Sequence, residues 1–421
     1  MTIRAAVVVT GTEVLTGRVR DRNGPWLAEQ LRQVGVDIAD IVIVGDRPTD
    51  LREALGFLAD LDLVITSGGL GPTADDLTAA VVAEFQGRSS SVDGELQARI
   101  GGIIERLSAG RGWRLDPEAT AAATRKQATV PDGAEVLAPV GTAPGLIVTD
   151  AAGSHPPIVV LPGPPRELRG MWPQVLTSRA VRAVLAGADE LRQRTLRLWG
   201  TPESELAAVL RAHDSSLAGL EITTCLRDGE LEIVTRFAPA AAATYAGFCD
   251  LIAAEYPQTL FSPDGRGIDE IVAERLLTRS LTVATAESCT GGLVAARLTD
   301  RPGSSAYLLG GLVTYSNQAK HELLGVPHEL LASVGAVSEP VVVAMAAGAR
   351  QRLGADVGIA TTGIAGPGGG SADKPVGLVH LCVSTADQVA HRRITVPGSR
   401  AEVRQRTVVV ALHMLRVLLA G

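Results

Sequence analysis

A serine in the last third of the chain lies where a hydroxyl could act as a nucleophile. Ser288 follows the apolar run LTVATA within the motif ESCTGG, and an Ala- and Leu-rich helical stretch comes next. At such a strand-to-helix turn, the first free N–H groups of the helix can bind an anion or a developing oxyanion. A serine that merely caps the helix is the alternative. The adjacent Cys289 is the rival nucleophile, or else a small buried residue.

A lysine is the matching candidate base. Lys320 is one of only three lysines among 39 basic residues, and it ends the run GLVTYSNQAK. The pattern predicts a strand that ends at Tyr315 and a helix capped by Ser316 or Asn317. Lys320 then falls in the first helical turn, where the positive helix end disfavours a cation and lowers the pKa of the amine. A neutral amine can take a proton from a hydroxyl, and a solvated surface lysine is the alternative.

Two more C-terminal segments offer groups that bind anions. The run TTGIAGPGGG (361–370) follows the strand VGIA and precedes KPVG (374–377). Glycines at strand ends let backbone donors approach a phosphate closely. Arg400 and Arg404, near the start of the final helix, could clamp a phosphate or a carboxylate. A flexible loop and solvated surface arginines are the alternatives.

A glycine-rich motif near the N-terminus carries two adjacent carboxylates. SGGLGPTADD (67–76) follows the strand DLVI. Its glycines and the helix start after them could cradle a diphosphate, and Asp75 with Asp76 could hold a divalent cation that bridges phosphate oxygens. The alternative is a helix capped by aspartate, which accounts for one carboxylate well and for the second poorly.

The spacing of apolar residues predicts the helices and strands that must position these groups. Residues 1–172 alternate apolar runs with amphipathic stretches, which predicts a βαβαβ parallel sheet with helices on both faces. Residues 173–262 predict a small α+β module, and the Pro- and Gly-rich run 263–267 predicts a linker. Residues 263–421 again interleave helices and strands. The predicted fold class is α/β, with two α/β domains joined by the smaller module.

Composition narrows the possible partners. The 421 residues predict two or three domains, and 39 basic against 46 acidic residues give a net charge of -7. This sign is wrong for binding nucleic acid or an anionic membrane by bulk electrostatics. No apolar run approaches the ~18 residues of a membrane span. The four cysteines form no CxxC pair, which indicates a reducing cytoplasm and argues against a structural zinc site. We expect a cytoplasmic protein that binds small ligands, without nucleic-acid or membrane partners.

Four motifs in the last part of the chain resemble, in register, the C-terminal domain of the competence/damage-inducible CinA family. They are ESCTGG, GLVTYSNQAK, GAVSEPVV, and GIAGPGGG with KPVG. The resemblance covers about 268–421. Members of that family include nicotinamide mononucleotide deamidases. The resemblance therefore implies hydrolysis of the carboxamide of nicotinamide mononucleotide (NMN) to nicotinate mononucleotide and ammonia, with no cofactor at this site.

The same resemblance implies a catalytic set, with Ser288 as nucleophile and Lys320 and Tyr315 as its proton-transfer partners. The residues agree with this chemistry, because no histidine motif is paired with Ser288 and a lysine is the remaining base. We expect neutral Lys320 to deprotonate Ser288 and Tyr315 to relay a proton to the departing ammonia. Backbone N–H groups near Thr290 and Gly291 would hold the oxyanion. The substrate-binding residues expected in this half are Thr290, Gly291, Thr362, Gly363, Gly366, Gly368, Lys374 and Arg400.

The N-terminal motifs resemble the N-terminal domain of the same family, itself similar to MoaB/Mog molybdopterin-binding domains. The motifs include SGGLGPTADD, GTAPG (141–145) and LPGPPREL (161–168). The resemblance covers about 1–172 and implies binding of a nucleotide diphosphate, with metal-dependent ADP-ribose pyrophosphatase activity. Leu70 stands where Mog-type domains carry Thr, which disfavours molybdopterin itself. The residues expected to act here are Gly68, Gly69 and Gly71 toward substrate and Asp75 and Asp76 toward a divalent metal.

The middle segment, 173–262, falls where such proteins carry a KH-like module. It has no GxxG loop, and its eight arginines against eleven acidic residues give -3, so RNA binding is not expected. A spacer or dimerisation role fits, and we expect a homodimer. Two alternatives to a two-activity enzyme stay open. One is a non-catalytic regulatory protein that binds nucleotides, and the other is a molybdopterin-binding protein.

Overall fold

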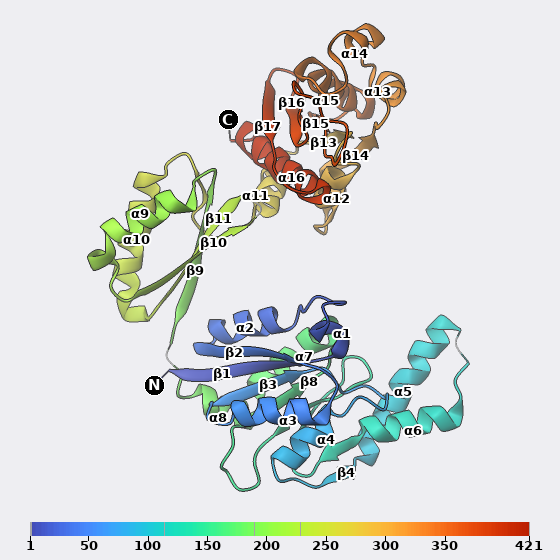
Figure 1. The fold of residues 1–421 in the computed structure, drawn as a ribbon, viewed down its shortest axis with the longest axis vertical. Coiled ribbons are helices and arrows are strands. Elements are labelled where there is room, and N and C mark those ends of the chain that lie inside the picture. Colours follow the sequence, from blue (N-terminus) through green and yellow to red (C-terminus); the bar gives the residue numbers. More distant parts are fainter. Residues whose placement is uncertain (1, 113, 189, 228, 421) are drawn as a thin grey trace. The chain divides into compact units, whose positions relative to one another are not determined.

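A computed structural model describes residues 2–112, 114–188, 190–227 and 229–420 (Figure 1). The chain divides into two compact units, Met1–Gln193 with Arg236–Ala242 and Arg194–Thr235 with Ala243–Gly421. Each unit has its own apolar cores. None of the described helices is long and apolar enough to cross a bilayer.

The first unit is built on a six-stranded sheet with the order β2-β1-β3-β8-β7-β6. Its strands are β1 (Ile3–Thr10), β2 (Val36–Val44), β3 (Leu63–Ser67), β6 (Glu135–Leu137), β7 (Gly145–Val148) and β8 (Ile158–Leu161). The first three strands and β8 pair in parallel, whereas β7 and β6 add antiparallel pairs. β1, β3 and β8 are almost entirely buried, because helices cover both faces of the sheet.

The helices of this unit form two layers. One layer packs against Val7, Ile65 and Val159 and consists of α2 (Gly24–Gln33), α7 (Pro165–Thr177) and α8 (Arg179–Leu185). The other packs against Val8, Val64 and Val160 and consists of α3 (Pro48–Phe57), α4 (Thr78–Phe85) and α5 (Gly94–Arg111). The remaining elements are α1 (Thr12–Leu15), β4 (Ser90–Val92), α6 (Pro117–Gln127) and β5 (Thr129–Pro131). The predicted α/β class, with a mainly parallel sheet between helical layers, is confirmed.

The end of this unit differs from the expected boundary at 172/173. Pro173 lies inside α7, and Met171, Trp172 and Val175 of that helix pack into one core of the sheet. The unit therefore continues through α8 to Gln193. The proline-rich run 162–165 precedes this helix instead of ending a domain, because a proline at the first helical position needs no N–H partner.

The middle segment forms a four-stranded sheet with the order β10-β11-β9-β12. Its elements are β9 (Arg192–Trp199), α9 (Glu203–Ala212), β10 (Leu220–Arg227), β11 (Glu230–Phe237), α10 (Ala242–Glu255) and β12 (Leu260–Ser262). Leu206 of α9 and Phe248 of α10 pack on Leu198 and Ile233 of the sheet. This is an α+β module, and its KH-like character stays a prediction.

The C-terminal part is a five-stranded sheet with the order β14-β13-β15-β16-β17. Its strands are β13 (Val283–Glu287), β14 (Leu308–Val313), β15 (Val357–Gly363), β16 (Leu378–Ser384) and β17 (Val389–Thr395). One face carries α11 (Ile268–Thr278), α12 (Leu293–Thr299) and α16 (Arg400–Leu418), and the other carries α13 (Asn317–Leu324), α14 (His328–Val334) and α15 (Glu339–Leu353). β13 is parallel to both β14 and β15, so the loops after these three strands meet at one edge.

The middle module packs directly on the C-terminal sheet domain through α16. The Trp199 ring stacks on His413 with centroids 3.9 Å apart, and Phe261 meets the same imidazole edge-on. His413 Nε2 lies 2.8 Å from Glu230 Oε1. The run 263–267, expected to be a linker, therefore joins two parts of one compact unit. Ser262 and Arg266 both donate hydrogen bonds to Asp264 within or beside this run.

Candidate active site

Ser288 and Lys320 lie together at the edge of the C-terminal sheet, although 32 positions separate them in the sequence. Lys320 Nζ is 3.1 Å from Ser288 Oγ. Ser288 directly follows β13, and Lys320 lies in α13, which starts after the parallel neighbour β14. Ser316 is the N-cap of α13, because its hydroxyl accepts from Ala319 N at 3.0 Å. Strand pairing and this cap together bring the amine to the hydroxyl.

The surroundings of the amine favour its neutral form. Lys320 is only 1% exposed, and burial lowers its pKa, because removal from water disfavours the ammonium; the nearby Cys289 has a smaller, opposite effect. Nζ lies 2.8 Å from the Thr314 carbonyl oxygen and 3.4 Å from that of Tyr315. A neutral amine has two N–H donors for these carbonyls and one lone pair for the Ser288 hydroxyl. An ammonium can donate to all three oxygens, so these contacts accommodate both protonation states, and burial is what favours the neutral amine that can accept a proton.

Cys289 is poorly suited to replace Ser288 as the nucleophile. Its side chain is 4% exposed and belongs to the apolar core with Val294 and Leu298 of α12. Burial raises the pKa of the Cys289 thiol to about 11. The thiolate is the nucleophilic form of cysteine, so almost none of it is present near neutral pH. The geometry favours the serine of the two rival nucleophiles.

Glu287, which the sequence reasoning missed, holds the turn that presents Ser288. Its side-chain oxygens accept N–H groups from Gly292 at 2.9 Å, Val294 at 3.0 Å and Ala295 at 2.8 Å. The residue is 1% exposed, and these charge-assisted bonds supply the partners that a buried carboxylate requires. Ser288 makes no capping bond to α12, whose N-cap is Gly292, so the alternative of a merely capping serine does not apply. The sequence did contain a signal for this role, because Glu287 is an acidic residue at the end of a strand that is buried along its whole length.

Glu287→Gln is expected to lower the free energy of unfolding by about 2–4 kcal/mol. The side-chain NH2 group of glutamine would face backbone N–H groups, and neither of these groups can accept a hydrogen bond. Denaturant titration followed by circular dichroism measures this change. Glu322→Gln is the matched control, because Glu322 is exposed on α13, and its effect should stay within about 0.5 kcal/mol. Equal stability of the two variants would contradict the assigned role of Glu287.

Arg400 connects the final helix to two expected site segments. Its guanidinium donates to the Gly366 carbonyl at 2.9 Å and to the Tyr315 hydroxyl at 3.0 Å. Tyr315 is 62% exposed, and only its main-chain oxygen contacts Lys320 within the described part of the chain. Its hydroxyl therefore accepts from Arg400 and keeps its own proton available for donation.

Arg404 lies one helical turn further on and fixes the turn after the nucleophile. It donates to the Thr290 carbonyl at 2.9 Å, and the Thr290 hydroxyl is 2.7 Å from that of Thr361. Gly291 has φ +59°, a conformation that favours glycine, and its N–H donates to the Ser288 carbonyl at 3.2 Å. The backbone donors expected near Thr290 and Gly291 are thus partly engaged before any substrate binds.

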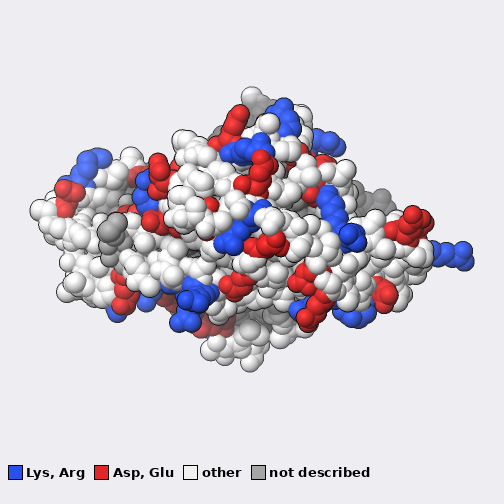
Figure 2. Space-filling view, turned by 90° about the horizontal axis from the view of Figure 1, so that it is seen from below, with Lys and Arg blue, Asp and Glu red and all other residues white. Residues whose placement is uncertain are grey.

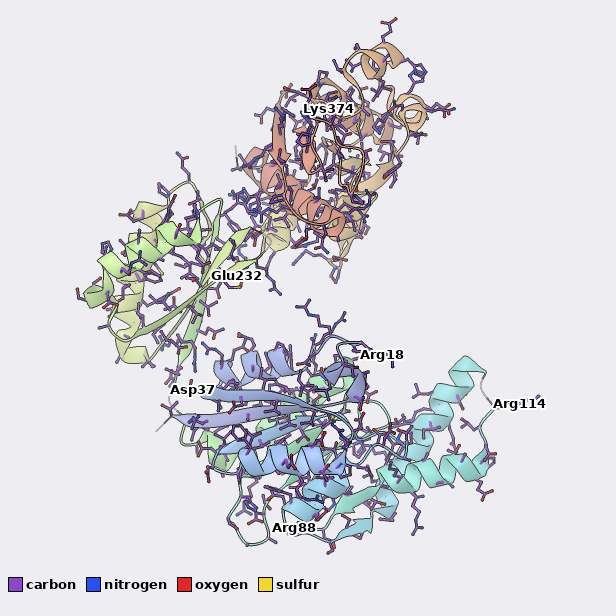
Figure 3. The ribbon with its side chains drawn as sticks, in the orientation of Figure 1. Arg18, Asp37, Arg88, Arg114, Glu232 and Lys374 are labelled. Carbon is purple, nitrogen blue, oxygen red and sulfur yellow. The ribbon has the colours of Figure 1, made fainter. Side chains whose placement is uncertain are left out.

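The other expected substrate residues surround the loop after β15. Thr362 is fully buried and donates to the Ala336 carbonyl at 2.9 Å, so its hydroxyl holds the turn between α14 and α15. Lys374, which is labelled in Figure 3, donates to the Val334 carbonyl at 2.7 Å. Both side chains therefore connect the glycine loop to that turn.

The three glycines of this loop occupy different settings. A side chain on Gly363 would meet the Leu378 carbonyl oxygen at 2.7 Å, and Gly366 has φ +78°. Gly368 faces open space. A side chain is therefore excluded by backbone at Gly363 and disfavoured by conformation at Gly366, whereas Gly368 leaves room beside the loop.

The N-terminal glycine motif also lies at the carboxyl end of parallel strands. Gly68 has φ +113° and a side chain there would meet Thr10 at 2.5 Å, while the space beside Gly69 and Gly71 is taken by Thr78 and Asp76. These glycines let the loop lie flat against β1 and α4. The helix α4 has Leu77 at its N-cap and no side-chain cap, so neither aspartate serves as the cap that the alternative required.

A cavity of about 460 Å³ opens beside this loop. Asn23 lies in its wall and donates to Ser67 Oγ at 2.9 Å and to the Gly163 carbonyl at 2.7 Å, while its buried Oδ1 has no hydrogen-bond partner in the described part of the chain. Arg20 and Arg22 line the same cavity. Its size suits a small-molecule site, and its lining carries two carboxylates, Glu13 and Asp21, beside the two arginines. From the glycine motif the cavity is lined by Ser67, whereas Asp75 lines a separate, smaller pocket with Asp46 and Thr78.

The two aspartates expected to hold a metal have different settings. Asp76 accepts from Thr73 N at 2.9 Å and from Thr73 Oγ1 at 2.5 Å, so it stabilises its own loop. Asp75 is exposed, and a hydrogen bond from Thr73 together with the nearby Lys126 keeps its pKa below the ordinary range. No group of three or more metal-binding side chains exists among the described residues. These two carboxylates fit a cation of the Mg²⁺ class only if substrate phosphates complete its shell.

Comparison with known proteins divides the chain into two matching regions. Residues 266–419 match the family described as CinA C-terminal domain, and residues 6–182 match the family described as probable molybdopterin binding domain. Over its full length the chain is 56% identical to a CinA-like protein of Mycolicibacterium gilvum, all of which is covered. It is 50% identical to a CinA-like protein of Mycobacterium tuberculosis, over 99% of this chain and 98% of that one.

Solved structures cover shorter stretches. The competence/damage inducible protein CihA of Agrobacterium tumefaciens is 48% identical, with 37% of this chain and 98% of that chain covered and a TM-score of 0.35. A MoaB protein of Thermus thermophilus is 20% identical, with 44% of this chain and 99% of that chain covered and a TM-score of 0.29.

Proposed function

The chain belongs to the CinA family, and on this premise we propose that its C-terminal part is a nicotinamide-nucleotide amidase that converts NMN and water to nicotinate mononucleotide and ammonia. The observation that carries the proposal is the 3.1 Å contact between a buried lysine amine and Ser288 Oγ. A hydroxyl attacks an amide only when a base removes its proton, and this pair supplies both groups.

The proposed reaction runs through an ester of Ser288. Lys320 takes the hydroxyl proton while Ser288 Oγ bonds to the carboxamide carbon of NMN. The C–N bond then breaks, and the nitrogen leaves as ammonia after it receives a proton. We assign this donation to Tyr315, whose hydroxyl accepts from Arg400 and so retains its hydrogen. Water then attacks the ester carbon, and the proton that this water loses restores the exposed Tyr315 hydroxyl. The ester C–O bond breaks, the proton held by Lys320 returns to Ser288 Oγ, and nicotinate mononucleotide is released.

The remaining site residues are proposed to bind the nucleotide. Arg400 lies between Tyr315 and the glycine loop, where a guanidinium can also meet the phosphate. Lys374 and the open space beside Gly368 belong to the same loop region. Ser288 itself is 9% exposed.

Release of ammonia from NMN by the full chain tests this proposal. We expect repeated turnover, with one ammonia for each nicotinate mononucleotide formed. A non-catalytic nucleotide-binding protein would instead show saturable binding and no turnover, and that result would exclude the amidase. The molybdopterin-binding alternative predicts tight pterin association and gives the buried Lys320 no role.

For the N-terminal part we propose a second activity, metal-dependent hydrolysis of the diphosphate of ADP-ribose. The supporting observation is the cavity beside Ser67, where Arg20 and Arg22 can meet phosphates and Asn23 Oδ1 has no hydrogen-bond partner among the described residues. A bound divalent cation would neutralise charge on the diphosphate. Asp75 and Asp76 are the residues proposed to hold it, and the glycine loop would lie along the phosphates.

Asp75→Asn is expected to reduce ADP-ribose hydrolysis by about 100-fold, because it removes a ligand charge without disturbing the Thr73 bonds of Asp76. Release of AMP in the presence of Mg²⁺ measures the rate. Asp60→Asn, another exposed aspartate of the same unit, should leave it unchanged. Hydrolysis that persists at the full rate in a metal chelator, or in Asp75→Asn, would refute the proposed metal site.

A further inference from the structure

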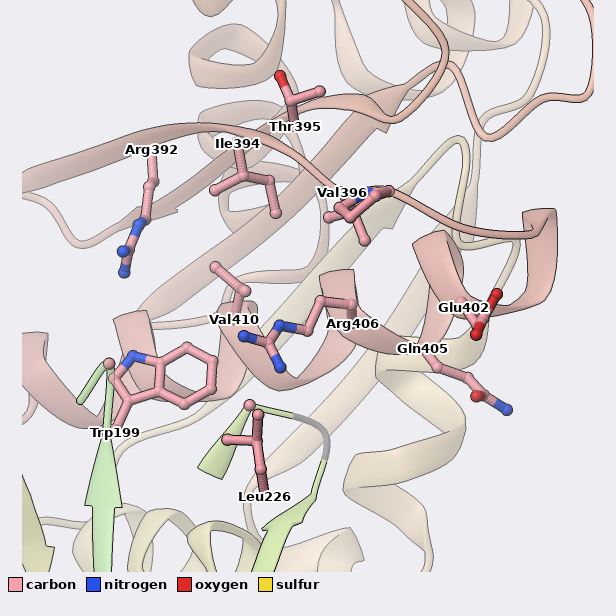
Figure 4. A pocket seen from close by; sticks show the side chains of 13 residues that line it. Trp199, Leu226, Arg392, Ile394, Thr395, Val396, Glu402, Gln405, Arg406 and Val410 are labelled. Atoms are coloured by element: carbon pink, nitrogen blue, oxygen red, sulfur yellow. The ribbon is translucent and has the colours of Figure 1, made fainter. Parts of the chain in front are cut away.

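A second cavity lies on the C-terminal unit, between the middle module and α16 (Figure 4). Its volume is about 560 Å³, within the range of small-molecule sites. None of the catalytic or substrate-binding residues proposed above lines it. Its described lining comprises Trp199, Gly200, Leu226, Gly229, Arg392, Ile394, Thr395, Val396, Pro397, Glu402, Gln405, Arg406 and Val410.

Specific packing contacts hold the residues that line this cavity. Trp199 is fixed by its stacking on the buried His413, and the Arg406 guanidinium lies 5.2 Å from the Trp199 ring centroid. Arg406 also lies directly over Gly229, where φ is +82° and a side chain would collide with the guanidinium. The positive φ favours glycine at this place, and Arg406 packs closely against it.

The lining combines an apolar surface with two guanidinium groups. Leu226, Ile394, Val396 and Val410 supply aliphatic surface, and Leu226 is 56% exposed. Figure 4 shows Arg392 extending from β17 and Arg406 from α16 toward the Trp199 and Leu226 side of the cavity. Glu402, the only carboxylate of the described lining, is turned to the helix start, where Oε2 accepts from Ser399 N at 2.6 Å. The described lining therefore offers two guanidinium groups to a ligand, while its one carboxylate is already engaged.

We propose that this cavity binds a small aromatic anion of the mononucleotide class. The flat ring would lie on the aliphatic side chains, and the phosphate would meet Arg392 and Arg406, because arginine suits planar stacking and bidentate phosphate binding. The ligand is bound without conversion, since Glu402 is engaged in capping and Thr395 has no base beside it in the described lining. The middle module thus forms half of a binding site instead of a spacer.

Titration calorimetry of the full-length protein with AMP tests this proposal. Arg392→Ala is expected to weaken AMP binding by about tenfold or more, because it removes one phosphate partner. Leu226→Trp should abolish binding by filling the cavity, and the exposure of Leu226 lets the larger side chain be placed without unfolding. The matched control is Arg393→Ala, which removes the same charge from the opposite face of β17 and should leave the affinity unchanged.

Two results would overturn the proposal. One is the absence of AMP binding to the wild-type protein. The other is binding that neither Arg392→Ala nor Leu226→Trp alters, since AMP would then occupy one of the other two sites. Unchanged melting temperatures of both variants establish that any loss of affinity comes from the cavity.

Discussion

Replacing Ser288 by alanine is expected to lower kcat for NMN hydrolysis by about 10⁴-fold or more, because the covalent route disappears with the hydroxyl that contacts Lys320. Lys320 loses nothing but its hydroxyl partner in this variant, so the fold should persist. Continuous measurement of ammonia release, with circular dichroism as the check on folding, gives the effect directly.

Cys289→Ser is the matched control for this loss. It exchanges sulfur for oxygen one residue away, in a side chain that packs in the core beside α12. We expect it to retain kcat within about tenfold, because the thiol with its raised pKa takes no part in the attack. If Cys289→Ser were inactive and Ser288→Ala active, the assignment of the nucleophile would be reversed.

Replacing Lys320 by methionine is expected to reduce kcat/KM by about 10²- to 10⁴-fold, the usual contribution of a general base. The methionine keeps most of the buried volume, so packing around Ser288 should be preserved. Lys320→Arg should be equally inactive, since a guanidinium is not deprotonated in proteins. Lys126→Arg, the same change in the N-terminal unit, should leave the amidase rate unchanged.

The pH dependence follows from the same lysine. The active form is the neutral amine, so kcat/KM of the wild-type protein should rise with pH through the lowered pKa of Lys320 and then level off. Between that pKa and the higher value in the unfolded chain, the native state binds fewer protons, so its stability also rises with pH. Lys320→Met should remove both trends. A rate that falls across this interval in the wild-type protein would contradict a neutral amine as the base.

Much of the C-terminal site could be predicted from short segments. The apolar run before Ser288 and the cap at Ser316 depend on local sequence, and these features place both reactive side chains at strand ends. Burial of Lys320 is a tertiary effect, because α13 must be pressed against the sheet beside β14 to remove the amine from water. The sequence suggested the helix end as the cause of the lowered pKa, whereas burial is the leading cause in the structure.

Other features could not be read from the sequence because they depend on long-range packing. Glu287 finds its three N–H partners only when α12 folds back over the end of β13. The stacking of Trp199 on His413 joins residues 214 positions apart in the chain, which no local pattern reveals. The expected boundary at 172/173 falls inside α7, whose apolar face packs on the N-terminal sheet.

The distribution of charged side chains on the surface bears on the partners that the protein can bind. On the face shown in Figure 2, Lys and Arg side chains are interspersed with Asp and Glu, and no broad surface of one sign is visible. Such a face offers no continuous basic track for a phosphate backbone. The expected absence of nucleic-acid and membrane partners, the homodimer and the cytoplasmic location stay predictions.

If Ser288 carries the acyl group during turnover, mass spectrometry of the full chain will detect it. NMN is mixed with enzyme, the reaction is stopped by acid within the first turnover, and the mass of the peptide that contains Ser288 is measured. We expect this peptide to gain the mass of nicotinate mononucleotide minus one water, and the gain to be absent in Ser288→Ala. First-turnover ammonia at the full rate without this adduct, or an adduct on Cys289, would contradict it.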